Sequence, residues 1–205
     1  MGSLLRKEDE KCSEIVSNFL DKKFYNKCDS FERFNDKDNQ IKGIDIIFSI
    51  NDIKYVCDEK AAIRYINRHL NTFAMELSFI NRKNILNDGW LLDDKKINDS
   101  FLLIYIDKAK NDIIQNEDDI EEIELILVKR NKIISFLEEL GWTKDKLIEK
   151  TKRIRDNECE NYGSFELNRC KFAYSKHLFE KPVNLLLLRD DLRKLSDLNE
   201  IIKNV

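Results

Sequence analysis

The chain has 205 residues, of which 42% are hydrophobic and 37% are charged, with a formal net charge of −3. A chain of this length can bury one sizeable core, so we expect a single domain over residues 1–205. No apolar run approaches the roughly 18 residues of a transmembrane helix, and we expect neither a membrane span nor a secretory signal. The composition therefore predicts a cytoplasmic protein with no membrane partner.

The five cysteines are odd in number and show no CxxC spacing. Most of them fall within apolar patterns, which is typical of reduced thiols rather than of disulfides or a zinc site. They are Cys12, Cys28, Cys57, Cys159 and Cys170.

In chain order, the first predicted element is an amphipathic helix over residues 8–24. Its apolar positions recur at helical spacing, at Cys12, Ile15, Val16, Phe19 and Leu20. This stripe predicts a helix that packs on a sheet. Glu14 lies at the edge of the stripe, among other acids of the same helix.

A polar stretch at 29–40 precedes two strand-like segments, 43–48 and 54–60, which the turn-prone Asn51-Asp52 pair joins into a hairpin. Side chains alternate between the faces of a strand, so Asp58 and Lys60 share one face, while Cys57 and Glu59 share the other. Pairing of the segments brings Asp45 towards Asp58. Two convergent carboxylates are the ligands that a hard divalent cation requires.

The rest of the chain alternates helices and strands without an internal repeat. We predict strands at 89–92, 100–106, 123–128, 172–178 and 183–188, and helices at 61–79, 132–140 and 144–155, with a closing helix from Asp190. Gly141 is a favoured helix end and Thr143 a favoured helix start. The sum is an α/β fold with a central mixed sheet flanked by helices.

Asp45, twelve intervening residues and then Asp58-Glu59-Lys60 resemble the motif of the PD-(D/E)xK nuclease superfamily. In that motif an acid on one strand is followed by acid-any-lysine on the next. Ile44 stands where the motif has proline, which leaves the metal ligand itself unchanged. The resemblance covers residues 10–110 and implies a restriction-endonuclease-like core (αβββαβ), with strand and helix additions over 120–205.

The resemblance implies Mg²⁺ or Mn²⁺ as cofactor, held by Asp45, Asp58 and the backbone carbonyl of Glu59. Many members of the superfamily complete the metal shell with an acid from the first helix, which makes Glu14 the candidate here. Lys60 is expected to orient the attacking water and to offset charge on the phosphate. The side chain of Glu59 is expected to be structural, because it points to the opposite face.

Charge is unevenly distributed along the chain. Residues 129–155 contain nine Lys or Arg and four Asp or Glu. A nuclease needs one basic face, since phosphate contacts supply most sequence-independent affinity. We therefore take Lys144, Lys150, Lys152 and Arg153 as candidate nucleic-acid contacts. An ordinary solvated helix face explains the same charges equally well.

The function that these features predict is a metal-dependent endonuclease, with DNA favoured over RNA as its nucleic-acid partner. Restriction, repair, recombination and mobile-element defence are the settings that the resemblance suggests, and such enzymes often act as homodimers. Two alternatives stay open. One is a non-catalytic member that binds nucleic acid or protein, for which the acidic stretch 112–124 would suit a protein contact. The other is an RNA endonuclease.

Overall fold

The computed structural model describes residues 2–156, 161–162 and 169–204, and the chain divides into two compact units. The first unit comprises Met1–Leu70, Ile97–Lys129 and Ser196–Val205, and the second comprises Asn71–Lys96 and Arg130–Leu195. The chain therefore leaves the first unit and re-enters it twice. The single-domain organisation expected from the length stays a prediction.

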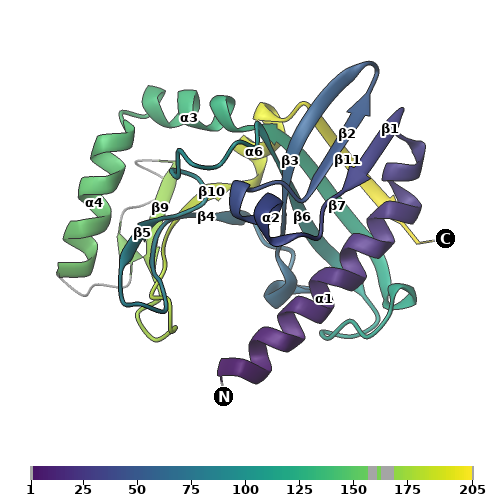
Figure 1. Ribbon diagram of the computed structural model, residues 1–205, viewed down its shortest axis with the longest axis horizontal. Helices are drawn as coiled ribbons and strands as arrows, with labels where there is room; N and C mark the ends of the chain where they lie inside the picture. Colours follow the sequence, from purple (N-terminus) through teal and green to yellow (C-terminus); the bar gives the residue numbers. More distant parts are fainter. Residues whose placement is uncertain (1, 157–160, 163–168, 205) are drawn as a thin grey trace. The chain divides into compact units, whose positions relative to one another are not determined.

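The first unit is built on a six-stranded sheet, which Figure 1 shows beside the long helix α1 (Gly2–Lys23). In spatial order its strands are β1 (Ser30–Arg33), β2 (Ile46–Ile50), β3 (Ile53–Ala61), β6 (Ser100–Ala109), β7 (Ile120–Lys129) and β11 (Leu198–Lys203). Neighbours β3 and β6 are parallel, and the other neighbouring pairs are antiparallel. The predicted α/β class, with a mixed sheet and flanking helices, is confirmed.

The β2–β3 hairpin forms as predicted. Asn51 and Asp52 have φ values of 50° and 64°, as a two-residue type I′ turn requires, and Asn tolerates this region better than most residues. The register places Ile46 opposite Cys57 and Phe48 opposite Tyr55. This turn fixes the strand alternation on which the candidate site depends.

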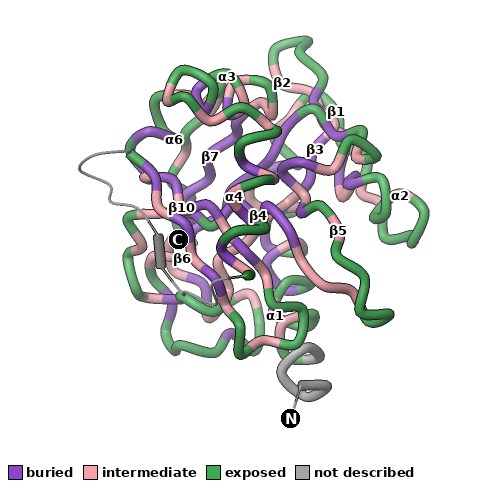
Figure 2. The backbone as a smooth tube through the Cα atoms, turned by 90° about the vertical axis from the view of Figure 1, so that its left-hand side faces the viewer, coloured by how far each residue is buried: buried purple, intermediate pink, exposed green. Residues whose placement is uncertain are grey.

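Helix α1 packs on one face of this sheet. Its residues Val16, Phe19 and Leu20 are at most 1% exposed, and they join one hydrophobic cluster with Cys57 of β3 and Leu102 of β6. Buried residues accordingly run along β3 and β7 (Figure 2). The predicted amphipathic helix is confirmed, although it begins six residues before the predicted start at residue 8.

The polar stretch 29–40 contains structure that the sequence did not indicate. The edge strand β1 and a short helix α2 (Lys37–Lys42) lie there, between the 3-10 turn η1 (Tyr25–Lys27) and β2. Asp36 caps α2 by accepting a hydrogen bond from the Asn39 N–H at 3.0 Å. Gly43 then ends the helix at φ 75°, a left-handed conformation that glycine adopts without strain.

The helix predicted over 61–79 is wrong. Strand β3 continues to Ala61, a 3-10 turn η2 (Ile63–Tyr65) follows, and Thr72–Ile80 is strand β4. Asn67 and His69 have φ values of 63° and 45°, which no helix accommodates. The apolar residues Phe73, Met75 and Leu77 fit a period of two, so the helical reading chose the wrong periodicity.

The strand predicted at 89–92 is also wrong, because these residues form a turn after the short strand β5 (Leu86–Asp88). A Cβ atom at Gly89 would lie 2.3 Å from the carbonyl oxygen of Glu76, so this backbone approach to β4 requires glycine. The Gly89 N–H donates to the Leu77 carbonyl at 2.8 Å.

The second unit is built on an antiparallel sheet in the order β5, β4, β10 (Val183–Leu188), β9 (Cys170–Tyr174) and β8 (Asn161–Tyr162). Its helices are α3 (Arg130–Glu139), α4 (Lys144–Asp156) and α6 (Arg189–Leu195). The predicted helices at 132–140 and 144–155 and the β9–β10 pair are confirmed, with Gly141 at φ 85° between the helices. Strand β11, which follows α6, was not predicted.

Within the described residues, no helix is both long and apolar enough to cross a membrane. Cys12, Cys28, Cys57 and Cys170 are free thiols, as expected, and Cys159 lies outside the described residues. Burial, followed by the nearby Glu59 and Asp58 charges, raises the pKa of the Cys57 thiol well above its ordinary value. This thiol is therefore a core group rather than a nucleophile.

Candidate functional site

Of the two acids of the motif, Asp58 lies in β3 and Asp45 lies directly before the neighbouring strand β2. Asp45 directly precedes β2, and its backbone N–H donates to the Cys57 carbonyl at 3.0 Å. Its own carbonyl accepts from the Phe34 N–H at 2.8 Å. The backbone on both sides therefore fixes Asp45 beside Asp58, as the hairpin predicted.

Asp58 and Lys60 share a face of β3, as the alternation required. Asp58 is 3% exposed, and the Lys60 Nζ donates to its Oδ1 in a short ion pair. The Lys60 side chain is 29% exposed, so the ammonium group remains in partial contact with solvent. This pair compensates one of the two carboxylates.

Asp45 is less well compensated. Its Oδ2 accepts a hydrogen bond from the Glu59 N–H at 2.9 Å. Burial, and then the neighbouring Asp58 charge, raise the pKa of the Asp45 carboxyl to about 7, although the Lys60 charge opposes this. Near neutral pH, Asp45 and Asp58 therefore favour a proton or a cation between them.

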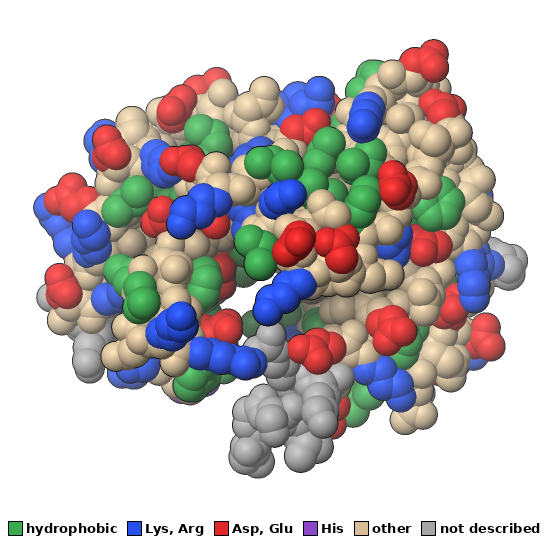
Figure 3. All heavy atoms as spheres, in the orientation of Figure 1, with side chains coloured by type: hydrophobic (Ala, Val, Ile, Leu, Met, Phe, Trp, Pro, Cys, Tyr) green, Lys and Arg blue, Asp and Glu red, His purple; other side chains and the backbone are tan. Residues whose placement is uncertain are grey.

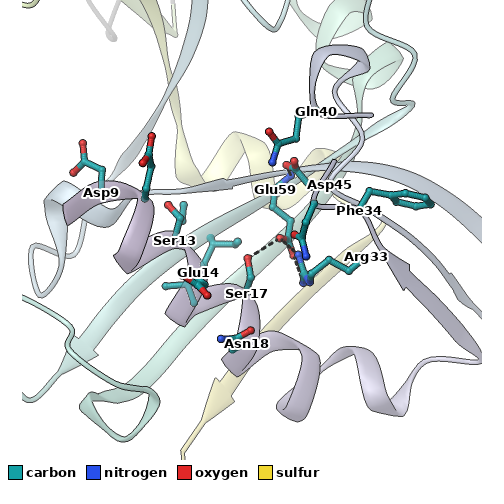
Figure 4. Close-up of a pocket in the computed structure, with 15 residues that line it drawn as sticks. Asp9, Ser13, Glu14, Ser17, Asn18, Arg33, Phe34, Gln40, Asp45 and Glu59 are labelled. Carbon is teal, nitrogen blue, oxygen red and sulfur yellow. Dashed lines mark hydrogen bonds and ion pairs between the residues drawn. The ribbon is translucent and has the colours of Figure 1, made fainter. Parts of the chain in front are cut away.

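Glu59 points to the opposite face of β3 and is fully engaged there. Its carboxylate accepts from Arg33 Nη1 at 2.6 Å, from Tyr25 Oη at 2.7 Å and from Ser17 Oγ at 3.2 Å. Figure 4 shows Arg33 and Ser17 approaching Glu59 from β1 and α1. The side chain is thus structural, as its face predicted.

Arg33 extends this network to α1. Its Nη2 and Nε donate to the Asp21 carboxylate at 2.6 and 2.9 Å, so the guanidinium bridges two acids. Burial lowers the pKa of Arg33, but the hydrogen bonds with Glu59 and Asp21 outweigh it and raise the pKa overall. Burial and the Glu59 charge also raise the pKa of Tyr25 well above its ordinary value, which keeps its hydroxyl a donor.

Sequence reasoning missed this network. Arg33 is 26 residues from Glu59 in a stretch that reads as a polar loop, and no local spacing relates the two. The only signal was indirect. A glutamate placed by alternation on the buried face of a strand needs a cationic partner.

A cavity of about 670 Å³ lies between α1 and the sheet. Asp45 and Glu59 contribute to its sheet side, and Glu14, Ser13 and Ser17 line it from α1 (Figure 4). Glu14 is exposed and faces this cavity. The structure thus places Glu14 and Asp45 on the same cavity, from different elements.

Glu14 does not join a tight ligand cluster with the motif acids. Across residues 2–156, 161–162 and 169–204, no three His, Cys, Asp or Glu side chains are grouped closely enough to hold a metal ion. The described site is a carboxylate pair with a lysine. The Glu59 backbone carbonyl lies beside it in β3, between β2 and β6.

The four candidate nucleic-acid contacts lie on α4, in the second unit. Lys144 forms an ion pair with Asp94, and Arg153 forms one with Glu149. The Lys150 ammonium lies 5.9 Å from the centre of the Phe172 ring, and Lys152 is exposed. The charges of Lys144 and Arg153 are therefore partly neutralised by ion pairs within the second unit.

Comparison with known proteins gives no further assignment, because no protein-family model, curated protein or solved structure matched the chain.

Proposed function

We propose that the protein is a divalent-metal-dependent endonuclease that hydrolyses phosphodiester bonds of nucleic acid, with DNA as the favoured substrate. The observation that carries the proposal is the convergence of Asp45 and Asp58 beside Lys60, with the pKa of Asp45 raised to about 7. Asp45 and Asp58-Glu59-Lys60 resemble the motif of the PD-(D/E)xK superfamily in residue type and spacing, although Ile44 replaces its proline and Asp45 lies directly before β2 instead of within it.

The donor set fits a hard divalent cation. Two carboxylates brought together at partial burial repel each other, and a cation between them would remove this cost. Asp45, Asp58 and the Glu59 carbonyl would hold Mg²⁺ or Mn²⁺, and Glu14, which lines the cavity with Asp45 but not with Asp58, is the candidate for a further, outer contact. When bound, such an ion polarises a phosphate oxygen and lowers the pKa of a water molecule.

The chain's own residues have distinct roles in this proposal. Lys60, held against Asp58, orients a water molecule and offsets negative charge on the phosphate. Glu59 is a positioning residue: Arg33, Tyr25 and Ser17 anchor its side chain, and its N–H donates to Asp45 Oδ2. The network around the Glu59 side chain thereby fixes the Glu59 backbone, and with it the proposed metal ligand Asp45.

The order of elements gives further support. Helix α1 precedes three antiparallel strands, β1 to β3, and β6 then lies parallel to β3, in line with an αβββαβ core. The departure is in the crossover. Where the core pattern has a helix, residues 62–99 contain η2, β4 and β5.

A second candidate is a non-catalytic nucleic-acid-binding member of the same fold. The observation that favours it is the lack of a third grouped ligand in the described part of the chain. The two candidates differ in one property, metal-dependent turnover, and an RNA endonuclease differs from the leading proposal only in its substrate.

The test is cleavage of labelled duplex DNA, single-stranded DNA and RNA with Mg²⁺ or Mn²⁺, with Asp58→Asn as the inactive variant. Asp107→Asn is a matched control, because Asp107 is an acid at the other end of the neighbouring strand β6. We expect metal-dependent cleavage that Asp58→Asn loses and Asp107→Asn keeps. Equal cleavage by wild type and Asp58→Asn would contradict the proposed site, and no cleavage by folded protein would favour the binding member.

A further inference from the structure

Two loops meet at one end of the second unit's sheet. The β4–β5 loop spans residues 81–85 and the β9–β10 loop spans 175–182, and we call the two together the tip. The Ile80 N–H donates to the Glu180 carbonyl at 2.7 Å, which joins the β9–β10 loop to the last residue of β4, where the β4–β5 loop begins. Figure 1 shows both loops leaving the sheet at the same end.

Both loops are ordered by their own hydrogen bonds. The Asn81 Oδ1 accepts from the Lys83 and Ile85 N–H groups at 2.9 and 3.0 Å, and the Asn81 N–H donates to the Ile85 carbonyl. In the other loop, the Ser175 N–H donates to the Pro182 carbonyl at 3.1 Å, and Leu178 donates to Ser175. The tip therefore presents its side chains from a preorganised backbone, which lowers the entropy cost of binding.

The charge of the tip is opposite to that of the chain. The tip contains Arg82, Lys83, Lys176 and Lys181 and one acid, Glu180, an excess of three positive charges against −3 for the whole chain. All five of these residues are exposed. Basic and hydrophobic side chains lie next to each other over this end of the sheet in Figure 3.

An aromatic side chain stands among these cations. Phe179 is 72% exposed and Ile85 is 53% exposed, whereas the neighbouring Leu178 is half-buried. The β9–β10 loop thus half-buries the Leu178 side chain and leaves the Phe179 ring in solvent. An exposed aromatic ring in a loop that also carries lysines is a combination on which an unpaired base can stack while its phosphates meet the cations.

We propose that the tip binds an unpaired segment of nucleic acid, with Phe179 stacking on a base and Arg82, Lys83 and Lys181 contacting phosphates. The choice of nucleic acid rests on the proposed function, and charge complementarity supports it independently. Helix α4 lies against the same sheet, because Arg155 donates to the Ser78 Oγ at 2.9 Å. The tip thereby adds a stacking element to the basic residues of this helix.

The experiment is fluorescence anisotropy of labelled oligothymidylate and of a duplex, in EDTA so that no cleavage occurs. The tip variants are Phe179→Ala and the double variant Arg82→Glu/Lys83→Glu. The matched controls lie in the first unit: Ile113→Ala removes a hydrophobic side chain of 71% exposure, and Lys27→Glu/Lys54→Glu reverses two exposed charges. Circular dichroism verifies that each variant is folded.

We expect Phe179→Ala to weaken single-strand binding by about 5-fold to 150-fold, the range for loss of one base stack, with a smaller effect on duplex. The charge reversal should also reduce the slope of log affinity against log salt by about 0.7 for each phosphate that the variant no longer neutralises. The controls should bind as wild type. Binding unchanged in the tip variants, or weakened equally for single strand and duplex by Phe179→Ala, would overturn the proposal.

Failure of this proposal is distinct from failure of the proposed nuclease. Loss of binding in the tip variants without any metal-dependent cleavage by wild type would retain the tip and reject the nuclease. Metal-dependent cleavage by wild type, together with tip variants that bind oligonucleotide as wild type does, would retain the nuclease and reject the tip. A wild-type protein that binds no oligonucleotide at low salt would overturn the tip proposal and leave a protein as the partner of this surface.

Discussion

The two faces of strand β3 carry carboxylates in opposite states. On one face, Glu59 accepts hydrogen bonds from the Arg33 guanidinium, which also binds Asp21, and from two hydroxyl donors. On the other face, Asp58 is paired with Lys60, and the adjoining Asp45, which directly precedes β2, has a pKa raised to about 7. Asp58 and Glu59, adjacent in β3, thus differ in their partners: Glu59 has three side-chain donors, whereas Asp58 has Lys60 and a second carboxylate beside it.

The difference separates a carboxylate that stabilises the fold from a pair that is suited to bind a ligand. A buried acid with a full set of partners has nothing to gain from a cation. A carboxylate pair with one cationic partner, Lys60, gains from a further positive charge placed between its members. Four substitutions, which differ widely in the size of their effects, test this contrast.

The largest effect is expected from Arg33→Ala. This change leaves the buried Glu59 carboxylate without its cation and should lower the free energy of unfolding by about 3–5 kcal/mol. Urea denaturation measures the loss, with Arg64→Ala as a control because the Arg64–Asp9 pair is largely exposed. A loss in Arg33→Ala no larger than in the control would contradict a stabilising network.

The second prediction concerns Asp45→Asn in the metal-free protein. The folded pKa is raised, so the protonated form is the one that folding favours, and wild type should lose stability as pH rises from 3.8 to about 7. Asparagine keeps an acceptor for the Glu59 N–H and cannot ionise. The variant should therefore be more stable than wild type above this window, by at most about 4 kcal/mol, because one pKa unit corresponds to about 1.4 kcal/mol.

Denaturation of both proteins across this pH range gives the measurement. The difference in unfolding free energy should shrink towards zero below the window. A difference that stays constant with pH would mean that Asp45 does not titrate in the folded protein as its environment indicates.

The third prediction concerns Lys60→Ala. If the ammonium offsets charge on the phosphate, its loss should reduce the cleavage rate by about 100-fold to 1000-fold, the range for removal of one preorganised donor. Metal binding should persist, because both carboxylates remain. Single-turnover rates at saturating metal measure the effect, and Lys108→Ala on β6 is the control. A rate within a few-fold of wild type would remove Lys60 from the chemistry.

The smallest effect is expected from Tyr25→Phe. The change deletes one of the hydroxyl donors to Glu59 at a fully buried position and should lower the free energy of unfolding by about 1–3 kcal/mol. The cleavage rate should change little, since Arg33 and Ser17 still hold Glu59. A large loss of cleavage rate in folded Tyr25→Phe would contradict this expectation and would mean that Tyr25 helps to position Asp45.

The sequence alone predicts the proximity of Asp45 and Asp58, but it does not predict the Arg33 partner of Glu59. A turn with two residues that tolerate positive φ, followed by a strict alternation, places Asp58 and Lys60 on one face and Asp45 beside them, and these features are local. The partner of Glu59 is not local: Arg33 lies on an edge strand within a polar stretch, and only the three-dimensional fold brings them together.

The same distinction explains the errors in the fold. Residues 72–80 carry apolar side chains at a period of two, and pairing with β10, more than a hundred residues later, stabilises them as a strand. Strand β11 is mostly exposed and carries a weak apolar signal of its own. It forms by antiparallel pairing with β7. Long apolar strands such as β6 and β7 were predictable since each carries its own signal.

The most direct test of the central claim is calorimetric titration of Mn²⁺ into wild-type protein and Asp58→Ala. At a pH below about 7, two buffers of different ionisation enthalpy will report protons released on binding. The carboxylate-pair account predicts saturable binding by wild type with proton release from the site, and loss of both in Asp58→Ala. Absence of binding by wild type, or equal binding by the variant, would contradict a metal site at Asp45 and Asp58.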